Sequence, residues 1–435
     1  MQILVAGGGP VGVFTAIALA RRGHDVTVVD RDPGPTADGT WRRAGVMQFE
    51  HAHGWRPQVV AALRAEMPDV LDALVAAGGR LVGLPGMPGI EMLSCRRPIV
   101  ERVLRACATR EDRLTWVTGH ADELEITDGR ATGLVVDGTR LAADLVVVAT
   151  GRSSRLGERL RGPVEGGPCG FSYVTRVYRA LPGVPAYDGF PSLQTGPGYV
   201  SVVIGNDTGT HSIVIAYPSD DAGFATLRTA AGQQRASRLI PNLAPWTDPE
   251  RCEPVTDVLV GGHLTNTYRL QGPALGMPPA TGLYFLGDSV LTTNPAAGRN
   301  LALLIPHAQH FLASLDDPEQ DLDDASLALD AWAEQHLRPW YLDHARWDRS
   351  LLRRFAGEDL DLTDRIPSDV ICAAVEVDES LAPHVGMYQG MVAGPEILDP
   401  VEARVRELLE QGWRPTAAGP SGVELAGAVS SSPRH

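Results

Sequence analysis

A glycine-rich turn follows the first apolar segment and constrains the fold more than any other feature of the chain. Residues 3–6 read Ile-Leu-Val-Ala and run into Gly-Gly-Gly-Pro-Val-Gly at 7–12, after which an apolar helical stretch begins. Gly7, Gly9 and Gly12 match the pattern G-x-G-x-x-G, whose glycines permit a tight turn, close approach of a diphosphate and close packing of helix on strand. Such a turn directs the free N–H groups of a helix N-terminus at a diphosphate.

The second predicted strand supplies the context that a lone glycine motif lacks. Residues 25–29 read Asp-Val-Thr-Val-Val, and Asp30 ends this strand roughly 20 residues after the glycines. An acid at this point accepts hydrogen bonds from both ribose hydroxyls of a dinucleotide. Because strand, glycine turn, helix and acid-tipped strand occur together, we predict that an adenine dinucleotide binds here and that the turn is not merely structural.

Charge and composition exclude several classes of function. The chain of 435 residues has a net charge of -15, which is unsuited to binding nucleic acid. Its basic residues are all arginine, so mechanisms that need a lysine amine are excluded. The five scattered cysteines form no C-x-x-C pair, which predicts reduced thiols and no metal site. Without a long apolar run or a basic leading segment, we predict a cytoplasmic protein that has no membrane span.

The periodicity of apolar residues predicts an α/β (α+β) chain. Helical spacing indicates one or two helices over 55–77 and another over 97–108, whereas the apolar run at 141–149 indicates a buried parallel strand. Alternation between 172 and 218 indicates an antiparallel sheet with one covered face. We predict a discontinuous, Rossmann-like three-layer dinucleotide-binding domain (1–165 and 270–330). A mostly antiparallel substrate domain (166–269) is inserted into it, and residues of about 75–95 could join the sheet of this second domain. C-terminal helices (331–412) and a disordered tail (413–435) follow.

Four motifs that lie far apart in the chain occur together. They are the glycine turn, Arg97-Pro98 at the start of a predicted helix, the sequence Ala-Thr-Gly at 149–151, and Gly287-Asp288 at the end of a late strand. In this combination the chain resembles the FAD-dependent monooxygenases of the para-hydroxybenzoate hydroxylase-like superfamily. It is most similar to the branch with polyether epoxidases, styrene monooxygenases and geranylgeranyl reductases. The resemblance covers residues 1 to about 315 and implies FAD as the cofactor.

The resemblance implies roles for individual residues. Asp288 would hold a ribityl hydroxyl of FAD, and Pro295 and Gly298 would line the isoalloxazine. Arg97 would reach the phosphates, although from the sequence alone it could equally be a solvent-facing helix arginine. Asn300 stands where the family has its second glycine, so its side chain could crowd the ring or hydrogen-bond to it. The residues that we expect to bind FAD are Gly7, Gly9, Pro10, Val11, Gly12, Asp30, Arg31, Arg43, Gln48, Arg97, Ala121, Gly287, Asp288, Pro295, Gly298 and Asn300.

A further stretch, residues 43–53, reads Arg-x-Gly-Val-x-Gln-x-x-His-x-His and is similar to a stretch of the epoxidase-like branch that passes the flavin. Two histidines at i and i+2 without nearby carboxylates or thiols more often form a hydrogen-bonding scaffold than a metal site. We therefore predict no metal and assign His51 and His53 a supporting role at the catalytic centre, together with Asn300.

The resemblance implies epoxidation or hydroxylation of an apolar or aromatic small molecule by dioxygen, through a flavin 4a-(hydro)peroxide, as in secondary metabolism. Ala-Thr-Gly at 149–151 replaces the Gly-Ala-Asp-Gly of the single-component hydroxylases, so reducing equivalents could come from NAD(P)H directly or through a separate flavin reductase. Flavin halogenases need a lysine and a Trp-x-Trp-x-x-Pro stretch, and the chain has neither. A double-bond reductase, and a non-redox cyclase or isomerase that retains FAD structurally, stay open as alternatives.

Some polar and aromatic residues are candidates for lining the substrate site. They are Tyr173, Arg176, Tyr178 and Arg179 in the predicted sheet, and His344, Arg346, Trp347 and Asp348 in a later helix. For each of them an ordinary sheet face or a packed helix is the competing interpretation. The chain lacks long heptad repeats, which excludes a coiled-coil dimer and leaves the oligomeric state undefined.

Overall fold

A five-stranded parallel sheet forms the centre of the structure, a computed structural model that describes residues 1–317 and 321–425. The strand order is β18-β9-β1-β2-β5. Strand β9 is buried along its whole length, because both faces of the sheet are covered. The strands are β1 (Gln2–Ala6), β2 (Asp25–Asp30), β5 (Leu114–Thr118), β9 (Leu145–Val148) and β18 (Leu283–Phe285).

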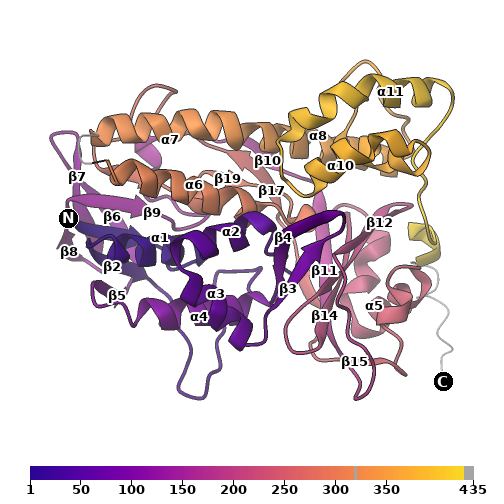
Figure 1. Cartoon of the computed structure of the whole chain (residues 1–435), viewed down its shortest axis with the longest axis horizontal. Helices are drawn as coiled ribbons and strands as arrows, with labels where there is room; N and C mark the ends of the chain where they lie inside the picture. The colour runs from indigo at the N-terminus through magenta and orange to yellow at the C-terminus, as the bar shows by residue number, and fades with distance from the viewer. Residues whose placement is uncertain (318–320, 426–435) are drawn as a thin grey trace.

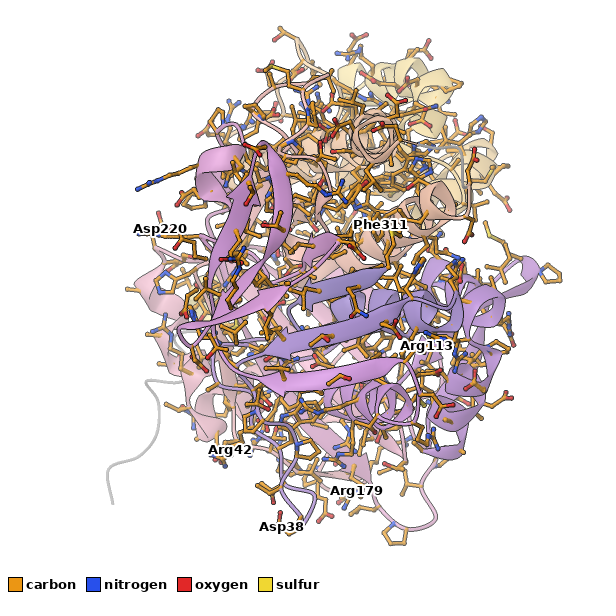
Figure 2. The ribbon with its side chains drawn as sticks, turned by 90° about the vertical axis from the view of Figure 1, so that its left-hand side faces the viewer. Asp38, Arg42, Arg113, Arg179, Asp220 and Phe311 are labelled. Atoms are coloured by element: carbon orange, nitrogen blue, oxygen red, sulfur yellow. The ribbon has the colours of Figure 1, made fainter. Side chains whose placement is uncertain are left out.

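Helices pack on this sheet, and their positions match the apolar periodicity of the sequence. Figure 2 shows Phe311 of α6 beside the parallel sheet, where its ring centroid lies 4.7 Å from that of Tyr284 in β18. The helix predicted over 55–77 is a pair, because Pro68 begins a new helix directly after Met67. The helices of this layer are α1 (Pro10–Arg21), α2 (Pro57–Glu66), α3 (Pro68–Ala76), α4 (Arg97–Ala108), α6 (Asn300–Leu315) and α7 (Leu322–His336).

A small antiparallel sheet precedes the buried strand β9. It consists of β6 (Ala121–Thr127), β7 (Arg130–Val136) and β8 (Thr139–Ala142), in that order. The single strand predicted over 141–149 is therefore wrong: β8 ends at Ala142, and β9 begins at Leu145 in the parallel sheet. The two strands belong to different sheets, a distinction that the apolar pattern does not carry.

The inserted domain is a six-stranded antiparallel sheet, seen to the right of the parallel sheet in Figure 1. The helix α5 (Ala230–Leu239) covers one face, and the central strand β14 is buried at nearly every residue. Both faces are thus covered, whereas the alternating sequence predicted one. The strands are β11 (Phe171–Ala180), β12 (Ser192–Gly196), β13 (Tyr199–Gly205), β14 (Thr210–Pro218), β15 (Cys252–Pro254) and β16 (Leu259–Gly261).

Two further sets of strands connect the layers. The hairpin of β3 (Arg80–Leu84) and β4 (Met87–Ser94) pairs within itself and bridges to Trp55, and it does not join the six-stranded sheet as the sequence suggested for 75–95. A separate sheet pairs segments from both domains: β10 (Glu165–Pro168), β17 (Thr265–Tyr268) and β19 (Leu291–Thr292).

The C-terminal helices form a lobe beside the six-stranded sheet, drawn from orange to yellow in Figure 1. Residues 414–425 continue from this lobe onto β12 and β13, where Ala418 N–H donates to the Thr195 carbonyl at 3.0 Å. The sequence predicted disorder over 413–435, so the placed part of this tail differs from the prediction, and residues 426–435 lie outside the described residues. The helices are α8 (Arg338–Phe355), α9 (Ser368–Ala373), α10 (Ala382–Gln389) and α11 (Asp399–Glu410).

The described residues, 1–317 and 321–425, lack two kinds of feature. No helix among them is both long and apolar enough to cross a membrane. Nor do they contain a cluster of three or more His, Cys, Asp or Glu side chains that could hold a metal ion.

Candidate functional site

A cavity of about 680 Å³ extends from the carboxyl ends of the parallel strands to the start of α6. Every residue that the sequence assigns to FAD lines this one cavity, including Ala121 and Gly287, which lie far apart in the chain. The carboxyl ends of parallel strands meet at one edge of a sheet, and ligands of such folds bind there. The chain thus gathers its separated motifs at a single place.

The glycine turn shapes the cavity floor at the N-terminus of α1. An ideal Cβ on Gly12 would lie 2.0 Å from the Gly7 carbonyl oxygen, and one on Gly7 would lie 2.3 Å from the Ala149 carbonyl oxygen. Gly9, in contrast, has an extended backbone (φ -77°, ψ 175°), and its ideal Cβ meets no atom within 4 Å. Gly7 and Gly12 therefore serve close packing of the backbone, whereas Gly9 keeps open the space in front of the helix N-terminus.

Asp30 lies at the end of β2 in a buried network of charges. Its Oδ2 accepts the Gly8 N–H at 2.5 Å and Arg43 Nη2 at 2.7 Å, and its Oδ1 accepts the Asp32 N–H at 2.7 Å. Arg43 Nη1 also donates to Glu101 Oε2 at 2.5 Å. Each carboxylate oxygen can accept more than one hydrogen bond, so Asp30 retains acceptor capacity for ribose hydroxyls while Arg43 fixes its orientation.

Arg97, in the first turn of α4, belongs to the same network. Its Nε donates to Glu101 Oε1 at 2.5 Å, its Nη1 lies 3.3 Å from His53 Nε2, and it lines the cavity. The alternative of a solvent-facing helix arginine is therefore wrong. Glu101, buried between Arg43 and Arg97, was not singled out in the sequence, because a lone glutamate inside a helix carries no motif.

The two histidines of the 43–53 stretch form hydrogen-bonded scaffold. His51 Nδ1 lies 2.9 Å from Thr175 Oγ1, and its ring meets the ring of Tyr173 edge-on at 4.7 Å. His53 lines the cavity and stacks on Trp55. Burial lowers the pKa of His51 to about 4 and that of His53 to about 3, so both rings are neutral near pH 7.

Asn300 begins α6 and turns its amide toward the preceding loop. Its Oδ1 accepts both the Thr293 N–H and the Thr293 hydroxyl at 3.0 Å, and its Nδ2 donates to Asp288 Oδ1 at 3.2 Å. Burial raises the pKa of Asp288 above its ordinary value. The Asn300 side chain is thus occupied in holding the loop and Asp288, where the sequence left open that it crowds a ring.

The loop that carries Pro295 is fixed by a buried cluster of polar groups. Asn294 donates its N–H to Asn266 Oδ1 at 2.7 Å and its Nδ2 to Asp348 Oδ1 at 3.1 Å. Asn266 Nδ2 in turn donates to Asp348 Oδ2 at 2.8 Å. Asp348 therefore positions the loop and does not line the cavity. Asn266 was missed in the sequence, because its partners come from distant segments.

Asp348 makes the stability of the protein depend on pH. Burial raises its pKa to about 7, so near pH 5 the folded protein holds a proton that the unfolded chain, with a carboxyl pKa of about 4, has released. Raising the pH through this window therefore favours unfolding, by up to about 4 kcal/mol for this group. We expect the unfolding free energy from urea titrations to fall between about pH 4 and pH 7 and to level off above about pH 8.

In Asp348→Asn this fall is expected to be smaller, because the titrating group is gone. The substitution also replaces an acceptor oxygen by a donor against Asn266 or Asn294, which should cost about 1–3 kcal/mol at every pH. The informative quantity is the difference in pH dependence between the two proteins, and equal slopes would contradict the assignment. Asp288, Asp330 and Asp369, whose pKa values burial also raises, are present in both.

Three of the candidate substrate residues of β11, Tyr173, Arg176 and Tyr178, have different positions. Tyr173 lines the cavity. The prediction is wrong for Tyr178, which is fully buried against α5 and donates its hydroxyl to Gln233 Oε1 at 3.0 Å, and for Arg176, which donates to the Thr256 carbonyl at 3.2 Å. Successive side chains of a strand point to opposite faces, so residues 176 and 178 cannot share the face of residue 173.

The polar groups that line the cavity suit FAD, and so does the path of the cavity from the strand ends to α6. Thr150 Oγ1 lines it and is buried without a hydrogen-bond partner among the described residues. Asp30 offers acceptors for a ribose, the N-terminus of α1 offers N–H groups for a diphosphate, and Asp288 lies beside the loop of Pro295. The residues present therefore fit this cofactor from end to end.

Sequence comparison points to the same cofactor. Residues 2–92 match the family described as FAD dependent oxidoreductase. A D-amino acid dehydrogenase of Rhizobium johnstonii is 47% identical over 55 residues, which are 13% of each chain. The chloroplastic zeaxanthin epoxidase of Solanum lycopersicum is 24% identical over 343 residues, covering 73% of this chain and 48% of that protein. The chain thus spans less than half the length of the curated relatives it matches.

Comparison with solved structures extends over almost the whole chain. PqsL of Pseudomonas aeruginosa, described as a probable FAD-dependent monooxygenase, matches with a TM-score of 0.61 at 17% identity, over 82% of this chain and 98% of that one. The flavin-dependent brominase Bmp2 matches with a TM-score of 0.65 at 13% identity over 94% and 99%. For p-nitrophenol 4-monooxygenase PnpA of Pseudomonas putida the TM-score is 0.60 at 15% identity over 93% and 97%.

These similarities confirm the fold expected from the separated motifs. A Rossmann-like parallel sheet with an inserted antiparallel sheet is common to this chain and to the matched structures. The family match lies on the first β-α-β unit and the segment up to β4. The chain therefore has the fold of the FAD-dependent monooxygenases, and its residues 2–92 carry the sequence pattern of FAD dependent oxidoreductases.

Proposed function

We propose that the chain is an FAD-dependent monooxygenase that inserts one oxygen atom of O₂ into an apolar or aromatic small molecule, by epoxidation or hydroxylation. The observation that carries this proposal is the single cavity lined by every residue that the sequence assigns to FAD. When bound, FAD supplies the electron transfer and the activation of oxygen. The similarity to zeaxanthin epoxidase and to p-nitrophenol 4-monooxygenase supports the reaction class.

The residues along the cavity would bind and orient the cofactor. Asp30 would accept the ribose hydroxyls, and the N-terminus of α1 in front of Gly9 would hold the diphosphate. Asp288 would accept a ribityl hydroxyl, held in place by Asn300. Pro295 would lie against the ring system, on a loop that Asp348 fixes through Asn294.

The six-stranded sheet would keep water away from the reacting atoms. Val202, Val214 and Ala216 line the cavity from β13 and β14, on the same face as Tyr173. Burial raises the pKa of the Tyr173 hydroxyl, so it stays protonated at neutral pH and can donate a hydrogen bond. An apolar wall of this kind limits loss of activated oxygen to solvent.

Residues 149–151 bear on the source of electrons. Ala-Thr-Gly stands here in place of the Gly-Ala-Asp-Gly of single-component hydroxylases, which favours reduction by a flavin reductase partner over direct use of NAD(P)H. Steady-state oxidation of NADPH by the FAD-loaded protein, with and without a generic flavin reductase, measures this choice. Rapid oxidation without the reductase would contradict the two-component arrangement.

The activity itself is tested by supplying isotopically labelled dioxygen to the FAD-loaded, chemically reduced protein with a panel of aromatic and polyene substrates. We expect one labelled oxygen atom in a product that free FAD does not form. Turnover under anaerobic conditions would instead indicate the double-bond reductase. Turnover that is independent of the redox state of FAD would indicate the cyclase or isomerase.

A halogenase is disfavoured despite the structural similarity to the brominase Bmp2. The chain contains no lysine at all, so it lacks the residue on which flavin halogenases depend for handling hypohalous acid. Bromide added to the assay above should therefore leave the product distribution unchanged. A brominated product would overturn this part of the proposal.

A further inference from the structure

We propose that a second cavity, of about 1090 Å³, is the substrate chamber, and that it takes a bulky, largely apolar and electrically neutral molecule. We further propose that the C-terminal tail, residues 414–425, is its outer wall. Both statements rest on the proposed function, because they place the substrate relative to FAD. They add the size and charge of a substrate, which the cofactor site does not define.

The second cavity adjoins the cofactor cavity at the loop before α6. The two share a set of lining residues, which includes Ala52, Gly54, Val202, Ile204, Pro295 and Gly298. Val202 and Ile204 belong to the inner face of the six-stranded sheet, and Pro295 and Gly298 are the residues expected against the isoalloxazine. A molecule in the second cavity can therefore present one end to the cofactor through this shared mouth.

The size and the walls of the chamber indicate a large apolar occupant. Its volume exceeds the 680 Å³ of the cofactor cavity. Apolar and aromatic side chains come from β12 and the segments next to the six-stranded sheet, and from the C-terminal lobe. They are Phe190, Leu193, Phe224, Trp347, Phe355 and Leu360. A single benzene-sized substrate would leave most of this surface without contacts, so a molecule of several rings or a long polyene fits better.

Arg56, Arg354 and Arg414 of the chamber have hydrogen-bond partners within the protein, and two of them pair with acids. Arg354 forms an ion pair with Asp369, and Arg414 Nη2 lies 2.8 Å from Asp359 Oδ2. Arg56 donates to three backbone carbonyls, at 3.0 Å to Gly298, 2.6 Å to Ala297 and 2.7 Å to Gln389. Because Arg354 and Arg414 are paired with acids, and Asp221, Glu358 and Glu376 also line the chamber, a phosphate or a strongly anionic ligand is disfavoured there. A neutral molecule avoids the cost of desolvating a charge there.

The tail lines the chamber but not the cofactor cavity. Gly422 N–H donates to the Pro197 carbonyl at 3.0 Å, and Gln194 Nε2 donates to the Ala418 carbonyl at 2.9 Å. Leu425 is only 1% exposed and packs in the core of the inserted domain with Tyr199 and Phe224. Since residues between Arg414 and Val423 line the chamber, this anchor holds a wall of the cavity in place.

The first experiment measures binding of Nile red, a neutral multi-ring fluorophore, to the FAD-loaded protein. We expect saturable binding of one dye per chain, with micromolar affinity and a blue-shifted emission. Ala373→Trp places an indole in the chamber from the end of α9, away from the cofactor cavity, and should weaken dye binding at least about tenfold. The matched control is Ala231→Trp on the exposed surface of α5, which should bind the dye like the wild type.

The second experiment releases the tail. Leu425→Asp buries a charge and should undock residues 414–425, which is expected to weaken Nile red binding at least about tenfold while FAD absorbance and affinity are retained. Leu275→Asp makes the same change at a side chain that is 58% exposed and should have no effect. If Leu425→Asp fails to fold, Ala373→Trp still tests the chamber.

The outcomes distinguish failure of the proposed chamber from failure of the proposed function. If the wild type binds FAD but not Nile red, the proposed chamber is overturned and the monooxygenase proposal stands. The same holds if Ala373→Trp binds Nile red as tightly as the wild type does. A protein that binds no FAD overturns the proposed function. Binding of the anionic dye 8-anilinonaphthalene-1-sulfonate in competition with Nile red and with equal affinity would overturn the neutrality of the substrate.

Discussion

Gly9→Val is expected to abolish FAD binding and to leave the fold unchanged. The backbone of Gly9 is extended, a conformation that valine adopts readily, and an ideal Cβ there meets no protein atom within 4 Å. The added side chain would occupy the space in front of α1 in which we place the diphosphate. We expect the affinity for FAD, measured by fluorescence quenching of the flavin, to fall at least about a hundredfold.

The position of the substitution within the turn decides the outcome. Gly12→Val, three residues later, would place its Cβ 2.0 Å from the Gly7 carbonyl oxygen, so this variant should fail to fold. Gly83→Val serves as the matched control, because its ideal Cβ also meets no atom within 4 Å and Gly83 lies outside the cavity. Normal FAD binding by Gly9→Val with unchanged thermal stability would show that the diphosphate does not lie at this turn.

The cavity residues at the ends of the parallel strands could be predicted, because each of them belongs to a short motif that is continuous in the sequence. The glycine turn, Asp30 and Gly287-Asp288 each stand at the end of a buried parallel strand, and the geometry of a parallel sheet brings such ends together. A short sequence pattern thus identifies both the residue and its place. Pro295 and Asn300, which follow Asp288 closely along the chain, were instead assigned through the resemblance to the FAD-dependent monooxygenases.

The parts that were missed depend on contacts between distant segments. Arg56 holds two carbonyls of the loop before α6 from the start of α2, and nothing near it in the sequence suggests this partner. Asn266 meets Asp348 through a contact that spans 82 positions. In β11 the prediction failed for another reason: both faces of the sheet are covered, so polarity did not distinguish the face of Tyr173 from that of Tyr178.

Arg299→Met is expected to destabilise the protein by about 3–5 kcal/mol, because it leaves a buried carboxylate without its counter-charge. Arg299 is 4% exposed, and its Nη1 lies 3.1 Å from Asp343 Oδ2. Its guanidinium also lies 4.8 Å from the ring centroid of Trp340 and 5.0 Å from that of Trp347. Loss of these cation–π contacts adds to the cost of the unpaired acid.

Comparison with two further variants shows whether the unpaired buried charge causes the loss of stability in Arg299→Met. Arg299→Met combined with Asp343→Leu removes both charges and should recover part of the lost stability. Arg353→Met breaks a pair with Glu358 in which both side chains are about half exposed, and should cost at most about 1 kcal/mol. Urea titrations followed by tryptophan fluorescence are suited to the comparison, since Trp340 and Trp347 flank Arg299. An equal loss in the single and the double variant would mean that Arg299 acts through packing and not through its charge.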